Sequence, residues 1–143
     1  MITVQQITDL AGEEAQQLFS IRNQVFVVEQ KVDHQLEHDA YDETAQHYIA
    51  CYDDIACGAA RYRHTEKGIK LERFAVLAGF RNKNVGVALL KKILEDCLSS
   101  NKKIYLHAQI SACGFYLKNN FIEEGEHFYE AGIEHVVMIY NNK

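Results

Sequence analysis

The sequence predicts an α/β fold in which helices flank a mixed central β-sheet. In the middle of the chain, residues 71–99 form a predicted strand, turn and helix, and a further strand follows at Lys103–Gln109. A helix that connects two neighbouring strands makes them parallel, because the chain crosses back before it re-enters the sheet. Strand pairs joined by short turns precede and follow this unit, and such pairs are antiparallel. Both orientations together make the predicted sheet mixed.

The N-terminal segment is predicted to supply one strand and one long helix. Ile2–Ile7 alternates in the manner of a strand, and Glu13–Glu29 carries apolar residues at helical spacing. Arg22 and Glu29 stand on the apolar side of this helix, where charges need partners. Two interpretations remain open: both side chains line a ligand-binding pocket, or the Arg22 stem packs in the core while its head reaches an acidic loop.

The polar connector Lys31–Ala45 is crowded with acidic and histidine side chains, and we interpret it as a solvated loop. His34 and His38 have an i, i+4 spacing that suits metal ligands. No rigid element is predicted there to hold them, so the sequence predicts no metal site. If the loop borders the ligand-binding pocket, its carboxylates would favour a cationic ligand such as an amine.

Two strands, His47–Tyr52 and Ile55–Arg63, are predicted to form a hairpin across the turn at residues 53–54. Alternation places Arg61 and Arg63 on the same face of the second strand. Arg61 is therefore a candidate for the floor of a pocket. Exposure to solvent at a strand end is the alternative, which suits Arg63 better than Arg61.

The central strand, turn and helix contain a candidate anion site. A bulky apolar run at Leu71–Leu77 predicts the strand, a basic turn follows at Ala78–Gly86, and helical spacing continues to Ser99. Free amides in the first helical turn, the positive end of the helix dipole and the cations Arg81 and Lys83 would suit a phosphate or pyrophosphate. The alternative is a solvated loop in front of a helix that packs on the core.

The C-terminal part is predicted to contain a short helix and two strands. Ile110–Asn119 is the helix, and it ends at asparagines 119 and 120, which tolerate the left-handed geometry of a helix cap. Phe121–Tyr129 and Glu134–Tyr140 are predicted to form an antiparallel pair.

Composition restricts the class of protein. A chain of 143 residues, 48% of them hydrophobic, fits one domain over residues 1–143. We expect a cytoplasmic protein without a membrane partner, because no leader sequence and no apolar run of about 18 residues occur. The net charge of −5 argues against a nucleic-acid partner. Four cysteines without C-x-x-C spacing are expected to be reduced and packed in the core.

Two segments resemble the acetyl-CoA signatures of the GCN5-related N-acetyltransferases, the GNAT superfamily. They are Arg81-Asn82-Lys83-Asn84-Val85-Gly86-Val87-Ala88 and Ala112-Cys113-Gly114-Phe115-Tyr116-Leu117-Lys118-Asn119-Asn120-Phe121. Residues 21–30, 107–109 and 132–135 resemble a small bacterial single-domain subgroup of that family. The likeness runs from about Leu18 to Met138.

This resemblance implies an acyl-CoA N-acyltransferase fold with acetyl-CoA as cosubstrate. The backbone of Phe74, Ala75 and Val76 would pair with pantetheine and polarise the thioester carbonyl, and Ala112 belongs to the second signature. The residues that would surround the pyrophosphate are Arg81, Asn82, Lys83, Asn84, Val85, Gly86 and Val87. Asn84 and Asn120 stand where the family usually has glycine. Because asparagine is the next-best residue for left-handed backbone, both turns are expected to survive.

The resemblance also implies a catalytic role for Tyr116. Tyr116 would protonate the departing thiolate, and its alternative role is that of a core aromatic beside Phe115. The candidates for the base that takes the amine proton follow from strand position: Glu72, on the strand beside the thioester, is the first, and His107, on the facing strand, is the second. The alternative for Glu72 is a carboxylate that is paired with neighbouring cations.

The predicted function is transfer of an acetyl group from acetyl-CoA to the primary amine of a small molecule by direct attack. An amino sugar or a polyamine is a candidate acceptor, with Arg22, Glu29 and Arg61 as candidate acceptor-binding residues. The expected partners are acetyl-CoA and this amine, and a homodimer is a candidate assembly. The alternative is a CoA-binding or interaction module that keeps the fold with little catalysis.

Overall fold

The computed structural model describes residues 1–141, in which seven strands form one mixed sheet. The strand order is β1-β2-β3-β4-β5-β7-β6, so the predicted mixed sheet is confirmed. From one edge to the other the strands are β1 Ile2–Ile7, β2 Gln46–Tyr52, β3 Ile55–Thr65, β4 Gly68–Val76, β5 Ile104–Gln109, β7 Ile133–Tyr140 and β6 Phe121–Glu130.

Helices connect the strands, largely where the sequence predicts them. The α-helices are α1 Glu13–Arg22, α2 His34–Glu37, α3 Val85–Leu98 and α4 Cys113–Lys118. Short 3₁₀ turns occupy Ala40–Glu43, Ala78–Phe80 and Ile110–Ala112. The predicted helix at residues 13–29 is present, but it changes from α to π geometry over Asn23–Glu29. π-helical segments of this kind are often found at functional sites.

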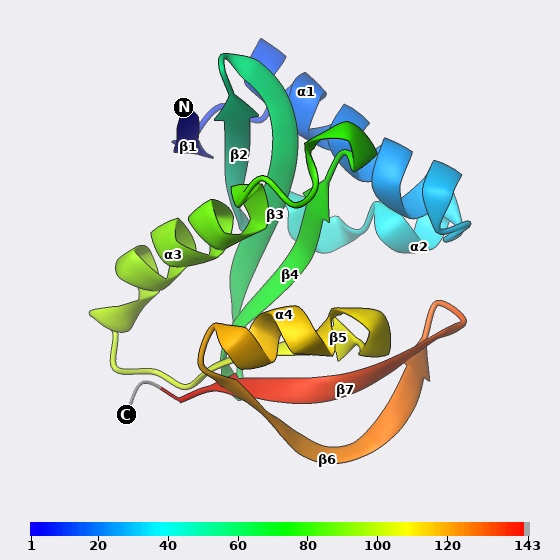
Figure 1. Ribbon diagram of the computed structural model, residues 1–143, viewed down its shortest axis with the longest axis vertical. Helices are drawn as coiled ribbons and strands as arrows, with labels where there is room; N and C mark the ends of the chain where they lie inside the picture. The colour runs from blue at the N-terminus through cyan, green and yellow to red at the C-terminus, as the bar shows by residue number, and fades with distance from the viewer. Residues whose placement is uncertain (142–143) are drawn as a thin grey trace.

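Two hydrophobic clusters cover the two faces of the sheet. Leu89 and Ile93 of α3 are buried against one face together with Leu71 of β4. Leu18 and Ile21 of α1 are buried in a separate cluster on the other face. Figure 1 shows the arrangement, with α3 in front of the sheet and α1 behind it. Each helix therefore buries its apolar face against the sheet, as its spacing predicts.

Gly58 of β3 allows α3 to approach the sheet closely. A Cβ atom at this position would lie 2.9 Å from Val85 Cγ1 and 3.1 Å from Leu89 Cδ1. Close-packed interiors do not accommodate carbon atoms at such distances without a shift of the backbone or side chain. The absence of a side chain at Gly58 thus allows the first turn of α3 to pack closely against the sheet, next to the end of β4.

The strands β4 and β5 pair over a short distance and then separate. Ile69–Leu71 pairs with Ile104–Leu106 in the parallel orientation that the sequence predicts. Beyond these residues the register between the two strands ends, and residues 72–76 have no strand partner on the side of β5. Figure 1 shows that β2 to β4 run along the long axis of the view, whereas β6 and β7 run across it. The sheet therefore opens between its two halves.

A β-bulge lies at the start of the unpaired part of β4. Arg73 and Phe74 stand opposite a single residue of β3, Ala60, because the register shifts between Ala59 and Arg61. Arg73 has a φ of 58°, in the left-handed region that is uncommon for residues other than glycine. The extra residue reverses the alternation of the strand, so Phe74 packs on the side of α3.

The connector between α1 and β2 is not a solvated loop, and this expectation is wrong. It contains α2 and a 3₁₀ turn, and its Glu37 and Asp42 are only 5% and 4% exposed. Both carboxylates form ion pairs with buried arginines, Arg22 of α1 and Arg61 of β3. Buried charges require such partners, so the connector is fixed against the sheet.

Left-handed residues form the turns that the sequence predicts. Asp53 and Asp54 have φ values of 47° and 68° in the hairpin between β2 and β3. Asn84 and Asn120 have φ values of 68° and 72°, so the prediction that asparagine maintains both turns is confirmed. Asn119 has a φ of −109° and leaves the left-handed position to its neighbour.

Candidate functional site

A cavity of about 790 Å³ lies where β4 and β5 separate. Residues 71–76 of β4 form one side of it, and residues 106–109 of β5 form the other. The π-helical segment, α4 and the hairpin of β6 and β7 add Val25, Phe26, Tyr116, Glu130, Ile133 and His135, and the connector before β2 adds Leu36, Glu37 and Asp39. Along this side β4 has an open edge, which can pair with an extended ligand in the way a further strand would.

Most of the predicted catalytic and strand residues come together in this cavity. Those that line it are Glu72, Phe74, Ala75, Val76, Arg81, His107, Ala112 and Tyr116. Arg63, which we expected at an exposed strand end, lines it as well. The site thus draws on segments as far apart in the sequence as Val25 and His135, which meet where the sheet opens.

Tyr116 forms the wall on the α3 side of the sheet. It is 7% exposed, and its ring packs edge to face on Phe74, Phe115 and Phe121, with centroids 6.2, 5.1 and 5.7 Å away. Burial raises the pKa of Tyr116, and nearby Cys113 adds to the rise, so the phenol keeps its proton at neutral pH. Tyr116 is thus both a packed aromatic and a protonated phenol in the cavity lining.

Glu72 lies on the opposite face of the sheet among three cations. Its Oε1 accepts hydrogen bonds from Arg61 Nε at 3.1 Å and Arg63 Nε at 2.8 Å, and its Oε2 lies 3.1 Å from Lys70 Nζ. Burial alone would raise the pKa of Glu72, but the charges and hydrogen bonds of these three neighbours prevail and lower it. A carboxylate with a lowered pKa is a poor proton acceptor at neutral pH.

His107 is held by an acidic residue that the sequence did not single out. Its Nδ1 lies 2.9 Å from Oε2 of Glu130, and its ring packs edge to face on Phe128 with centroids 5.0 Å apart. The hydrogen bond with His107 lowers the pKa of Glu130, although burial opposes the change. A charged carboxylate at Nδ1 favours the tautomer that carries its proton there and leaves Nε2 free to accept one.

Arg22 and Arg61 do not line the cavity, which corrects their assignment to an acceptor pocket. Both are 1% exposed. Arg22 donates to Glu37 at 2.9 Å and to Asp42 at 2.6 Å, and Arg61 donates to Asp39 at 2.8 Å and to Asp42 at 2.7 Å. Carboxylates of the connector therefore occupy both guanidinium groups. For Arg22 the structure matches the alternative in which its head reaches an acidic loop.

Glu29 is also absent from the cavity lining, because it forms an ion pair with Arg81. Arg81 donates to the two oxygens of Glu29 at 2.9 and 2.6 Å and to the carbonyl oxygen of Val76 at 2.9 Å. The hydrogen bond from Arg81 lowers the pKa of Glu29. The predicted pyrophosphate cation thus already has partners, and it ties the end of β4 to the π-helical segment.

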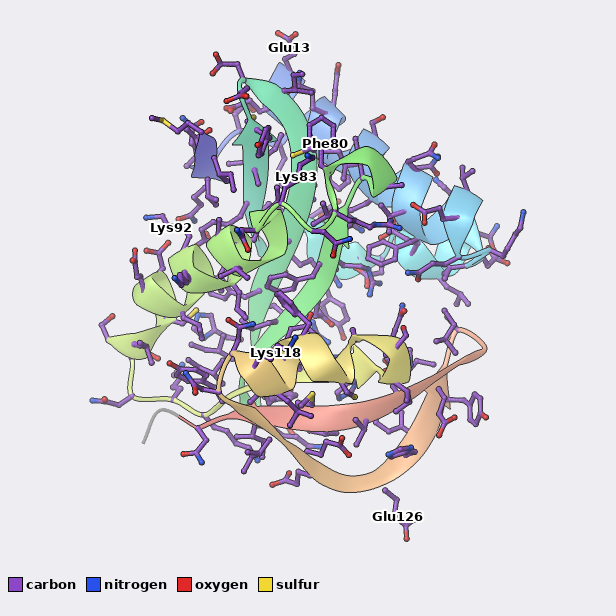
Figure 2. The ribbon with its side chains drawn as sticks, viewed as in Figure 1. Glu13, Phe80, Lys83, Lys92, Lys118 and Glu126 are labelled. Carbon is purple, nitrogen blue, oxygen red and sulfur yellow. The ribbon has the colours of Figure 1, made fainter. Side chains whose placement is uncertain are left out.

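The loop before α3 has the backbone geometry of an anion site. Asn82 and Asn84 are left-handed, with φ values of 64° and 68°, and Asn84 directly precedes the first residue of α3. Amides 85–87 then stand in the first helical turn, where they have no acceptor within the helix. Figure 2 shows Lys83 on this segment between β4 and α3. Residues 82–87 lie outside the cavity lining, beyond the end of β4 that borders it.

Sequence reasoning missed several residues of the cavity lining, among them Arg73, Glu130 and His135. Arg73 is a charged residue inside the apolar run 71–77. Its presence there was the available indication that the regular alternation of the strand is interrupted. Glu130 and His135 flank the turn at residues 131–132, and both line the cavity. Their proximity depends on the pairing of β6 with β7, which periodicity alone does not give.

Several features bear on other classes of site. Within residues 1–141, no helix is long and apolar enough to cross a membrane. In the same part of the chain, no three His, Cys, Asp or Glu side chains are grouped so that they could hold a metal ion. His34 and His38 stack on each other with centroids 6.0 Å apart. All four cysteines are free thiols, and three of them are buried.

Known proteins share both the sequence pattern and the fold. A family model described as an acetyltransferase (GNAT) domain matches residues 6–141. The uncharacterized protein YyaT of Bacillus subtilis is 36% identical over 125 residues, which cover 82% of each chain. The uncharacterized N-acetyltransferase YjcF of the same organism is 30% identical over 129 residues, which cover 89% of this chain and 92% of the relative.

Two crystal structures extend this similarity to three dimensions. Escherichia coli ElaA is 27% identical with a TM-score of 0.84, and the alignment covers 99% of this chain and 100% of ElaA. An acyl-CoA N-acyltransferase from Pseudomonas aeruginosa is 26% identical with a TM-score of 0.84, and the alignment covers 99% of both chains. The match confirms the predicted acyl-CoA N-acyltransferase fold. The chain therefore belongs to the GNAT family of acetyltransferases.

Proposed function

We propose that this protein transfers an acetyl group from acetyl-CoA to the primary amine of a small molecule. The observation that carries the proposal is the open edge of β4 at residues 72–76, which borders a cavity with Tyr116 on one face and His107 on the other. An acyl transfer to an amine needs a proton donor for the leaving group and a proton acceptor for the amine. The two faces of the opened sheet offer one of each.

The chain offers a continuous set of groups that would hold acetyl-CoA. The open edge of β4 at Phe74–Val76 would pair with the extended pantetheine arm, and a free amide there would stabilise negative charge on the carbonyl oxygen. The left-handed turn at Asn84 presents the first amides of α3, and with Lys83 these would bind the pyrophosphate. Bound acetyl-CoA supplies the activated acetyl group as a thioester.

Tyr116 is proposed to donate its proton to the sulfur that departs. Its pKa is raised by burial, so the proton is present at neutral pH. As the bond between the carbonyl carbon and sulfur breaks, a proton from a nearby phenol converts the departing thiolate into the neutral thiol. Aromatic packing on three sides holds the ring in place.

His107, rather than Glu72, is proposed to accept the proton of the attacking amine. The carboxylate of Glu130 holds the proton on Nδ1 and orients the ring, which leaves Nε2 as the basic atom. Glu72 was the first candidate from the sequence, but its contacts with three cations lower its pKa. Glu72 therefore acts through charge, and not through proton transfer.

The test has a binding arm and a turnover arm. Acetyl-CoA should raise the melting temperature, because a ligand that binds only the folded state stabilises it by mass action. Release of free CoA thiol in the presence of a panel of primary amines should then reveal transfer. Stabilisation without thiol release for any amine would favour a CoA-binding module, and the absence of any stabilisation would refute the assignment of the cofactor.

A further inference from the structure

One carboxylate at the cavity wall is shared by more cations than it can neutralise. Glu72 contacts Arg61, Arg63 and Lys70 at distances between 2.8 and 3.1 Å. Arg61 has further carboxylate partners in the connector. Within residues 1–141, however, Glu72 is the one carboxylate within 4.0 Å of Arg63 or Lys70. Arg63 and Lys70 therefore share a single carboxylate as their ion-pair partner in the part of the chain that the structure describes.

Arg63 and Lys70 also have hydrogen-bond donors to spare. Arg63 bonds Glu72 through Nε alone, and its Nη1 and Nη2 make no hydrogen bond to any described residue. Its guanidinium carbon lies 3.9 Å from the centroid of the Tyr41 ring, which fixes the plane of the group. Lys70 has three N–H donors and one contact. Both side chains line the cavity and are only 19% and 12% exposed, so solvent reaches these donors poorly.

These donors lie on the same face of the sheet as His107. Arg63 is opposite Lys70 in the pairing of β3 with β4, and Lys70 is opposite Tyr105 in the pairing of β4 with β5. His107 is two residues beyond Tyr105, so alternation returns it to the same face. Tyr116 lies on the other face with Phe74. The spare donors thus stand beside the group that would receive the amine proton.

We propose that the acceptor amine also carries a carboxylate, and that Arg63 and Lys70 bind this carboxylate. The two Nη donors of an arginine form a planar fork that matches the two oxygens of a carboxylate, and the lysine adds a charge-assisted hydrogen bond. The amine of the same molecule then faces His107. The inference rests on the proposed acetyl transfer and narrows its acceptor to the amino acids and related amino carboxylates.

The connector does not oppose this assignment. Its carboxylates were expected to favour a purely cationic amine, but Glu37 and Asp42 are buried in ion pairs with arginines. Two further carboxylates line the cavity: Asp39, which is paired with Arg61 and Arg73, and Glu130, which hydrogen-bonds His107 and whose pKa the charge of Lys70 also lowers. Glu130 therefore holds the base, and the spare donors of Arg63 remain available.

The test compares the common amino acids with their carboxamides, which differ only in the charge of one group. Calorimetric titration in the absence of acetyl-CoA should show that the wild-type protein binds at least one amino acid about 10- to 100-fold more tightly than its amide, since hydrogen bonds to charged groups are worth that much. Arg63→Gln and Lys70→Gln should each reduce this ratio to near 1. Lys67→Gln removes an exposed cation outside the cavity and should leave the ratio unchanged.

Each outcome decides the proposal. Equal affinity of the wild-type protein for every amino acid and its amide would overturn it. It would also be overturned if Lys67→Gln lowered the ratio of the two affinities as much as Arg63→Gln and Lys70→Gln do. Should Arg63→Gln fail to fold, Lys70→Gln carries the comparison. A preference for phosphoethanolamine over ethanolamine, without any preference for carboxylates, would overturn the choice of anion.

Turnover separates this inference from the proposed function. Thiol release from acetyl-CoA with neutral or polyamine acceptors, and none with amino acids, would refute the carboxylate site while supporting acetyl transfer. A preference for amino acids in binding, with no thiol release from any acceptor, would support the site and refute the transfer reaction.

Discussion

Replacement of Asp42 by asparagine should destabilise the protein by about 3 kcal/mol at neutral pH. Its buried carboxylate accepts hydrogen bonds from Arg22 at 2.6 and 3.1 Å and from Arg61 at 2.7 Å. The loss of one member of a buried ion pair typically costs ~3–5 kcal/mol, because the remaining charge stays buried without its partner. Arg22 keeps Glu37 and Arg61 keeps Asp39, so the lower end of the range applies.

The pH dependence of stability gives a second estimate of how much the Asp42 carboxylate contributes to the free energy of unfolding. Burial would raise the pKa of Asp42, but the hydrogen bonds and charges of Arg22 and Arg61 lower it from 3.8 to about 2. A group whose folded-state pKa lies below its unfolded value contributes stability above the unfolded pKa, and this stability is lost as pH falls toward the folded pKa. The shift corresponds to ~2.4 kcal/mol, of which about half should be lost by pH 3.

Urea unfolding at pH 7 and pH 3 measures both effects. The stability difference between wild type and Asp42→Asn should shrink by ~1 kcal/mol at the lower pH, since the wild-type carboxylate is then partly protonated in the unfolded state. Asp54→Asn is the matched control, because Asp54 is exposed and its φ of 68° suits asparagine as well. A difference at pH 7 no larger than that of the control, or one that does not change with pH, would refute the buried charge network.

Three further predictions concern catalysis and packing. Tyr116→Phe should lower kcat by ~10²–10⁴-fold and leave the KM for acetyl-CoA unchanged in steady-state kinetics with any acceptor. An unchanged kcat would mean that Tyr116 has only a packing role. His107→Gln should lower kcat by ~10²–10⁴-fold. In Glu72→Gln, kcat should still fall at acidic pH as it does in the wild type. If the fall at acidic pH is lost in Glu72→Gln, Glu72 is the base. Gly58→Ala should destabilise the protein by ~1–3 kcal/mol in urea unfolding, because its Cβ would lie 2.9 Å from Val85 Cγ1. An unchanged free energy of unfolding in Gly58→Ala would mean that α3 can move away from the sheet at little cost.

The elements of the fold were predictable because their evidence is local. Apolar spacing along residues 85–98 identifies α3 and its buried face, since each turn of a helix repeats the same pattern. The turns at Asn84 and Asn120 were predictable because few residue types accept left-handed backbone. The parallel orientation of β4 and β5 followed from the helix between them.

The site was predictable only where a family signature names the residue. Tyr116 and the loop at residues 81–87 carry such a signature, and Tyr116 lies in the cavity. The partners of Arg22 and Arg61 lie about 20 residues away in the connector, and no periodic pattern links them. The same holds for the contact of His107 with Glu130, which depends on how β6 returns to the sheet. Charges on an apolar stripe indicate that partners exist, but not which ones.

The bulge at Arg73 connects the charge network to the two faces of the site. A non-glycine residue in left-handed geometry costs ~1–3 kcal/mol, so its surroundings must hold it there. The side chain of Arg73 donates to the carbonyl oxygen of Glu37 at 3.2 Å and to Asp39 Oδ2 at 3.2 Å, and both acceptors belong to the connector. Because of the bulge, Glu72 faces the cations while Phe74 faces Tyr116. The connector thus fixes one backbone irregularity, and this irregularity turns Glu72 and Phe74 to opposite faces of the opened sheet, which the proposed function assigns to the acceptor and to the thioester.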